Sequence, residues 1–260
     1  MPQRVSKSDN DILKFAASFV NLRTSDICDL TGRSLRRIQR RMRKLRLDEN
    51  GGLGLFYDDL RNPANPFEKV HRLTQKGWDE ALRRNLLDKE VNANREKSEG
   101  QLEHDLVLTD FHKALHRTFG ANLNWSQLYA ARYKRWGKGR DEYVNADAFF
   151  FIEKDGEYSA FFVEIENQKG VEEPLRKMRA YAEFADGHYQ EMFNHSDFRV
   201  IILKPTPAMT SHVLSAARED KAVNTRRFWL TDYDSALKPS ERVFKTPKDF
   251  ETASYSLLFA

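Results

Sequence analysis

Three acidic residues lie within apolar stretches in the second half of the chain. Asp147 falls in VNADAFFFI at 144–152, and Glu164 and Glu166 fall in YSAFFVEIE at 158–166. Both stretches are rich in aromatic and β-branched residues, which predicts buried strands joined by the turn EKDG. Positions i and i+2 of a strand project from one face, so Glu164 and Glu166 are expected side by side. Pairing of the two strands brings Asp147 next to them.

Three acids clustered in an apolar sheet predict a bound divalent cation. Such carboxylates repel one another and raise one another's pKa unless a cation lies between them. Hard oxygen ligands suit Mg²⁺ or Mn²⁺. Lys169, three residues after Glu166, is expected to balance charge or hold a phosphate. In the alternative interpretation, Glu164 and Glu166 lie at a sheet end and pair with Arg176 or Lys177.

The elements around the acids follow the order αβββαβαβ. A helix with buried Leu108, Phe111, Leu115 and Phe119 ends at Gly120, and Glu103 points towards its inner flank. The strands are expected at 125–133, 144–152, 158–166, 198–203 and 227–230, and the further helices at 172–184 and 208–219. Strands that are apolar on both faces are central and covered on each side.

This arrangement resembles the PD-(D/E)XK, or restriction-endonuclease-like, nucleases, whose core is also αβββαβ. Asp147, Glu164, Ile165 and Glu166 match the motif, with Glu103 in the position of the family's helical Glu. The resemblance implies a metal held by Asp147, Glu164 and the Ile165 carbonyl. Ala146 replaces the family's Pro, and Glu166 stands where Lys is usual. The identity of the general base is therefore left open: it is Glu166 or a nearby Lys, either Lys169 or Lys177.

The first part of the chain carries a strongly basic helix. Ser34 is expected to cap LRRIQRRMRKLRL, in which Leu35, Ile38, Met42 and Leu45 form the apolar stripe. No acid occurs between Arg33 and Leu47. Arg suits phosphate and guanine edges, so the helix is predicted to read DNA. The predicted DNA-binding residues are Arg33, Ser34, Arg36, Arg37, Arg40, Arg41, Lys44, Lys69 and Arg72. A solvated or partner-binding face is the alternative.

Flanking elements resemble a winged helix-turn-helix domain over roughly residues 8–86. One helix is expected from Ser8, a second from Thr24 or Ser25 to Gly32, and a closing helix is capped by Thr74. Short strands are expected at Leu53–Tyr57 and Lys69–Leu73. The predicted fold is therefore α+β with two domains: a winged helix-turn-helix at 1–86, a linker at 87–100, and the PD-(D/E)XK-like domain at 101–260.

Composition agrees with a DNA-binding module at the start of the chain. Of the 260 residues, positions 1–95 hold 20 Lys plus Arg and 13 Asp plus Glu, a net of +7, and the remainder has a net of −3. The mean hydropathy of −0.71 and the single Cys exclude a membrane-spanning helix and an internal disulfide. A reducing cytoplasm is the expected compartment.

Together, the two domains resemble the replication-relaxation proteins and the MOB-C class of plasmid mobilisation relaxases. The resemblance implies a protein that nicks DNA at an origin of a plasmid or phage-like element. Double-stranded DNA, a second copy of the chain and other mobilisation or replication proteins are the expected partners. In a relaxase variant, Tyr181 would attack the phosphate and leave protein attached to the 5′ end.

Two other interpretations remain open. A regulator of transcription or replication with an inactive nuclease-like domain is favoured by Glu166 at the position of the usual Lys. A zinc enzyme would use His104, His112 and His116, but no Glu accompanies them in the HExxH sense.

Aromatic and basic residues at 125–140 are also expected to form a DNA-gripping hairpin.

Overall fold

A computed structural model describes residues 5–19, 21–46, 52–57, 61–86, 99–127, 144, 146–187 and 197–259. The chain divides into two compact units, Met1–Thr109 and Asp110–Ala260. The division falls inside helix α5 (Glu99–Phe119), later in the chain than the predicted linker. Residues 87–98 of that linker lie outside the described ranges. No helix among the described residues is long and apolar enough to cross a membrane.

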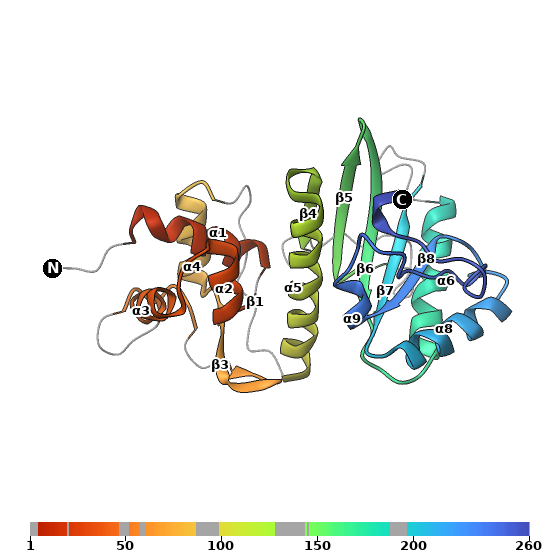
Figure 1. The fold of residues 1–260 in the computed structure, drawn as a ribbon, viewed down its shortest axis with the longest axis horizontal. Coiled ribbons are helices and arrows are strands. Elements are labelled where there is room, and N and C mark those ends of the chain that lie inside the picture. The colour runs from red at the N-terminus through yellow and green to blue at the C-terminus, as the bar shows by residue number, and fades with distance from the viewer. Residues whose placement is uncertain are drawn as a thin grey trace. The chain divides into compact units, whose positions relative to one another are not determined.

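Helices dominate the first unit (Figure 1). Its elements are η1 (Lys7–Asp9), α1 (Asn10–Phe19), β1 (Asn21–Arg23), α2 (Thr24–Thr31), α3 (Leu35–Leu45), β2 (Arg61–Asn62), β3 (Asn65–Arg72), α4 (Gln75–Arg83) and the start of α5. The strands pair antiparallel in the order β1-β3-β2. Gly32 ends α2 with a φ of 63°, and the Thr74 hydroxyl caps α4 by accepting from the Gly77 N–H at 3.2 Å. These predicted helix boundaries are confirmed.

Two expectations for this unit were wrong in detail. Ile38, Met42 and Leu45 are fully buried, but Leu35 is 53% exposed and does not join the core. Leu53–Tyr57 is not a strand, and only Phe56 forms isolated bridges there. Leu55 and Phe56 are consecutive and both buried, which a strand with one solvent-facing side does not allow. The strand that pairs with β3 in the hairpin is β2.

A mixed five-stranded sheet forms the centre of the second unit. Its order is β4 (Leu123–Gln127), β5 (Ala148–Lys154), β6 (Glu157–Ile165), β7 (Arg199–Lys204) and β8 (Phe228–Asp232). β4, β5 and β6 are antiparallel, whereas β6, β7 and β8 are parallel. The helical elements are η2 (Gly120–Asn122), α6 (Glu172–Gly187), α8 (Pro207–Glu219), α9 (Tyr233–Ala236) and η3 (Leu257–Phe259). The predicted order αβββαβαβ is confirmed for the described elements from α5 to β8; residues 128–133 of the first predicted strand lie outside the described ranges.

Aromatic side chains fill both faces of this sheet. On one face, Phe162 contacts Tyr181 of α6 at a ring distance of 5.4 Å, and α8 contributes to the same core cluster. On the other face, Phe111 of α5 packs edge-on against Phe150 at 6.3 Å. Because successive strand residues point to opposite faces, Glu164 projects on the α6 side with Phe162.

Candidate functional site

Asp147 lies one residue before β5 rather than inside the strand. It remains bound to β6, since its N–H donates to the Val163 carbonyl at 2.9 Å. Its Oδ2 accepts a hydrogen bond from the Ile165 N–H at 2.8 Å. The β5–β6 pairing therefore places the Asp147 carboxylate beside Glu164, as predicted from the strand register.

Glu164 and Glu166 share one ammonium group, that of Lys177 on α6. The Lys177 Nζ lies 2.5 Å from Glu164 Oε2 and 2.6 Å from Glu166 Oε1. The predicted placement of the two acids on one face is thereby confirmed. The other Glu164 oxygen, Oε1, accepts from the Tyr181 hydroxyl at 2.6 Å. Both carboxylates are buried, with exposures of 1% and 4%.

Electrostatics at this cluster oppose full ionisation of Glu164. Burial, followed by the nearby Asp147 carboxylate, raises the pKa of Glu164 to about 7, although Lys177 and Tyr181 act in the opposite direction. Burial alone lowers the pKa of Lys177, but Glu164 and Glu166 outweigh it and raise that pKa above its ordinary value. Lys177 is therefore held as a cation at the centre of the acids.

Lys204 is a second buried cation next to the acids, and sequence reasoning missed it. Its side chain is fully buried, and Nζ donates to the Gln168 carbonyl at 2.6 Å. Burial lowers the pKa of Lys204; Glu166 acts to raise this pKa, and Lys177 lowers it further. The available signal was the position of Lys204 at the end of the apolar run RVIILK. The ends of two neighbouring parallel strands lie side by side. A charged residue at the end of one strand therefore lies near the end of the other.

Three other predicted residues have different surroundings. Lys169 is exposed in the loop after β6, and Lys177 occupies the position between the acids. Glu103 is exposed on the part of α5 that belongs to the first unit. The Tyr181 hydroxyl is buried and donates to Glu164; burial, then Glu164, raises the pKa of Tyr181 well above its ordinary value. These features oppose its use as a nucleophile.

The carboxylate oxygens of the cluster are hard ligands of the kind that a divalent cation such as Mg²⁺ prefers. Glu164 and Glu166 pair with Lys177, and burial, followed by the Asp147 carboxylate, raises the pKa of Glu164. Lys177 already occupies the Glu164 and Glu166 oxygens, however. Among the residues that the structure describes, no group of three or more His, Cys, Asp or Glu is arranged to hold a metal ion. His104, His112 and His116 form no such group among the described residues, and His112 stacks on Trp125 with the ring centroids 4.1 Å apart.

The basic residues in and just before α3 fall into two groups: some form ion pairs with acids, and the others are exposed. Arg41 forms two hydrogen bonds with fully buried Asp9, and Arg33 Nη2 lies 2.7 Å from Asp11 Oδ2. Burial alone raises the pKa of Asp9, but Arg41 and Ser6 hold it below its ordinary value. The predicted contact residues Arg36, Arg37, Arg40 and Lys44 are exposed, as is Ser34 at the N-cap position.

The β2–β3 hairpin presents one basic residue and one large aromatic residue. Lys69 is exposed, whereas Arg72 is only 6% exposed and lies over the Tyr57 ring at 4.7 Å. Phe67, which sequence reasoning missed, is 99% exposed. The sequence signal for this exposed side chain was a Phe between Pro66 and Glu68, next to residues that are typical of turns. Of the predicted DNA-gripping hairpin at 125–140, residues 128–140 lie outside the described ranges.

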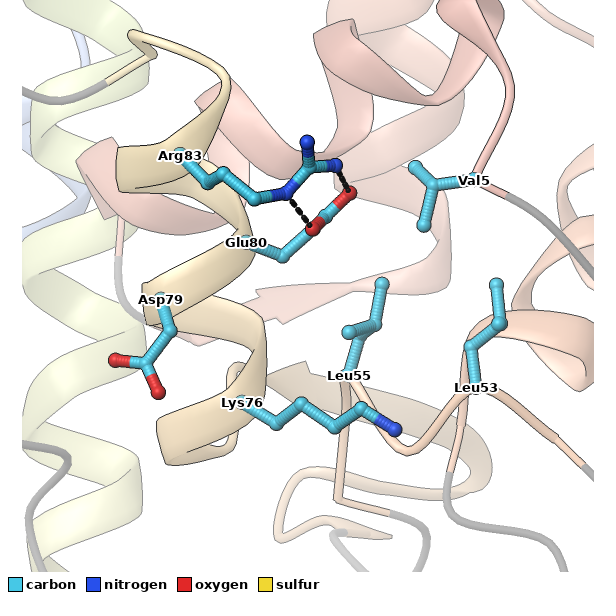
Figure 2. A pocket seen from close by; sticks show the side chains of 7 residues that line it. All are labelled: Val5, Leu53, Leu55, Lys76, Asp79, Glu80 and Arg83. Atoms are coloured by element: carbon cyan, nitrogen blue, oxygen red, sulfur yellow. Dashed lines mark hydrogen bonds and ion pairs between the residues drawn. The ribbon is translucent and has the colours of Figure 1, made fainter.

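Two cavities lie in the first unit. The cavity in Figure 2 has a volume of about 250 Å³; Val5, Leu53 and Leu55 point towards it, while Glu80 is paired with Arg83. Two of its polar lining residues, Glu80 and Arg83, are thus already engaged in an ion pair. The other cavity, of about 270 Å³, separates the N-terminal segment from α3 and is lined by Ser6, Ser8, Arg33, Arg37, Ile38, Arg40, Arg41 and Lys44.

Comparison with known proteins gives one family match. The family model described as Replication-relaxation matches residues 19–201. No curated protein matches the chain. The chain is similar to the restriction endonuclease FokI, with a TM-score of 0.35, 8% identity and coverage of 98% of this chain and 47% of that one. For FokI bound to DNA, the TM-score is 0.32 at 8% identity, with coverage of 91% and 45%. The chain thus spans about half the length of FokI.

Proposed function

The chain belongs to the replication-relaxation family, and from this premise we propose that it binds specific DNA sequences and cleaves DNA with a divalent metal. The proposed reaction is nicking at an origin of a plasmid or phage-like element, as in MOB-C-type mobilisation. The observation that supports it best is the buried cluster of Asp147, Glu164 and Glu166 around Lys177, at the sheet position expected for a PD-(D/E)XK nuclease.

In this proposal, the first unit is a winged helix-turn-helix domain. Its order of α1, β1, α2 and α3 followed by the β2–β3 hairpin supports that assignment. The exposed cations of α3 face DNA, and Lys69 contacts the backbone from the hairpin. Double-stranded DNA is then the principal partner. Pairing of two copies would convert a nick into a double-strand cut.

The residues of the cluster have distinct proposed roles. Asp147 and Glu164, with the Ile165 carbonyl, would hold Mg²⁺ or Mn²⁺, which supplies an activated water and stabilises the developing phosphate charge. Tyr181 fixes one Glu164 oxygen through its 2.6 Å hydrogen bond. Lys177, which extends from α6, would take the role that a Lys on the strand has in the usual motif. Glu166 would orient the water or accept its proton, and Lys177, which is held as a cation, would only orient it.

The decisive test is nicking of a negatively supercoiled plasmid library that carries fragments of the native genome, with Mg²⁺, Mn²⁺ or EDTA. Wild-type protein should produce open circles only with metal. Asp147→Asn and Glu164→Gln should reduce the rate at least about 100-fold and retain DNA binding. Glu153→Gln, at an exposed acid on β5, is the matched control. Equal nicking by Asp147→Asn would exclude this site.

A regulator with an inactive nuclease-like domain is the second candidate. Engagement of both Glu164 oxygens, one by Lys177 and the other by Tyr181, favours it. Such a protein would bind a specific duplex and cut no form of DNA with any metal. Gel-shift and nicking assays on the same plasmid library distinguish the two candidates.

A further inference from the structure

The basic residues of α3, together with the preceding Arg33, fall on two sides of the helix. Arg33, Arg37, Arg40, Arg41 and Lys44 follow the three- and four-residue spacing that places side chains on one side of a helix. All five line the cavity of about 270 Å³ beside the N-terminal segment. Arg36, Gln39 and Arg43 follow the same spacing on another side and do not line the cavity. The cavity is called the α3 notch below.

Two of the five notch cations are neutralised within the protein. Arg41 pairs with buried Asp9, and Arg33 pairs with Asp11. Arg37, Arg40 and Lys44 form no ion pair with any residue that the structure describes. Three exposed positive charges therefore converge on one concave site, a costly arrangement unless an anion enters it.

Hydrogen bonds within the protein fix part of the wall of the notch. The Ser6 and Ser8 hydroxyls line it 2.8 Å apart. Asp9 holds the Ser6 hydroxyl at 2.7 Å and also binds the Arg41 guanidinium. One buried carboxylate thus fixes both a hydroxyl and a guanidinium in the wall of the notch.

We infer that the α3 notch is a phosphate-binding site, and that a backbone phosphate of bound DNA fills it. Arg37, Arg40 and Lys44 supply the charge, while Arg36, Gln39 and Arg43 are left to contact base edges. Arg and Gln are suited to that task because both make paired hydrogen bonds to purines. The inference rests on the proposed DNA binding and assigns separate tasks to two sides of one helix.

The test uses the full-length protein and a duplex selected from random sequence for binding to it. Single phosphates of that duplex are replaced by uncharged methylphosphonate, one position at a time. For wild type, one position should weaken binding about tenfold. Arg40→Gln and Lys44→Gln should each weaken binding to selected and random duplexes alike, and should be insensitive to replacement at that position. Each should also reduce the slope of log Kd against log salt by about 1.

Arg36→Gln and Arg43→Gln are the matched controls, since they remove the same type of exposed side chain from the other side of α3. They should reduce discrimination between selected and random duplexes and remain sensitive to the critical methylphosphonate. If Arg40→Gln is as sensitive as wild type at every position, the DNA-phosphate assignment is overturned.

A second measurement tests the notch independently of DNA. Inorganic phosphate should raise the Tm of wild type above its value in chloride at equal ionic strength, and Arg40→Gln should abolish the shift. A phosphate-dependent shift without any coupled DNA position would identify a site for free phosphate and overturn the DNA source. Absence of both effects overturns the notch as a phosphate site. Failure of wild type to bind any duplex would instead contradict the proposed function.

Discussion

Substitution of Tyr181 distinguishes hydrolysis of the DNA backbone from covalent attack by the protein. Its buried hydroxyl donates to Glu164, so Tyr181→Phe should lower the free energy of unfolding by about 1–3 kcal/mol through the unsatisfied carboxylate. Metal-dependent nicking should persist, and no DNA should remain attached to protein after SDS treatment. Tyr158→Phe, at a half-exposed side chain on β6, is the control. Loss of nicking in Tyr181→Phe together with a wild-type protein–DNA adduct would establish covalent attack.

His71 makes the stability of the first unit depend on pH. Burial, then the charges of Arg46 and Lys69, lowers the pKa of His71 to about 3, from 6.5 for an ordinary His. Below pH 6.5 the unfolded chain binds a proton that the folded chain excludes. Stability from this residue is therefore complete above pH 6.5 and falls by about 1.4 kcal/mol per pH unit as pH decreases towards 3.

Urea unfolding of wild type and His71→Gln between pH 7.5 and 5 measures this effect. Gln retains a group that can bond the Thr24 hydroxyl, which now lies 2.9 Å from the His71 Nε2. The variant should lose less stability than wild type on acidification, by up to about 1.4 kcal/mol per unit. The exposed His212→Gln is the control. Parallel pH curves for wild type and His71→Gln would contradict the buried neutral state.

Helix α3 combines structural and exposed arginines, and substitution should separate them. Arg41→Gln leaves the buried Asp9 carboxylate without its guanidinium, which should cost about 3–5 kcal/mol of unfolding free energy. Arg40→Gln removes an exposed charge and should change stability by less than about 0.5 kcal/mol. Chemical denaturation of both variants checks the difference. Adding Asp9→Asn to Arg41→Gln should recover part of the loss, whereas equal stability of the two single variants would refute the division.

The β2–β3 hairpin holds Phe67 in a fixed, solvent-facing position. Glu68 accepts from the Ser25 N–H and the Asn62 amide, both at 3.1 Å, and so ties the hairpin to α2. An apolar side chain of this kind is suited to wedge into the minor groove of bound DNA. Phe67→Ser should leave stability within about 0.5 kcal/mol and reduce DNA bending. Fluorescence transfer across the bound duplex measures the bend, and an unchanged bend would exclude the wedge.

Local sequence signals were sufficient for most element boundaries. Gly32 and Thr74 identified the end of α2 and the start of α4 because a left-handed C-cap and a hydroxyl N-cap have strong residue preferences. The Asp155-Gly156 turn was equally legible, with φ values of 53° and 82°. Leu53–Tyr57 misled because its apolar pattern reflects packing in the helical core rather than strand pairing.

The partners of the acids depend on tertiary structure, which spacing does not reveal. The strand register placed Asp147, Glu164 and Glu166 together, since pairing and alternation follow from local pattern. Lys169 is closer to Glu166 in sequence, but Lys177 reaches the acids because α6 folds back across that face of the sheet. Lys204 comes from a parallel neighbour after a helical crossover. Sequence separation alone therefore does not identify which of the two candidate lysines contacts the acids.

Charge is divided between the two parts of the chain: a net of +7 in residues 1–95 and −3 in the remainder. The exposed cations of α3 lie in the first unit, whereas the buried acids Glu164 and Glu166 lie in the second. DNA affinity and DNA cleavage are accordingly expected to respond to different substitutions. Salt should weaken affinity through the exposed cations and have little effect on the buried cluster.

A double-substitution cycle with Arg40→Gln and Asp147→Asn tests this separation in the intact protein. Arg40→Gln should weaken DNA binding about tenfold and leave the nicking rate at saturating protein unchanged, because it removes only a binding charge. Asp147→Asn should reduce that rate at least about 100-fold with the same affinity and the same salt slope as wild type. The two effects should combine independently, since residues without shared partners have additive free energies. Single-turnover nicking and anisotropy titrations over a range of salt concentrations provide both quantities. A changed salt slope in Asp147→Asn, or a slower saturating rate in Arg40→Gln, would show that the acids and the basic helix act as one electrostatic site.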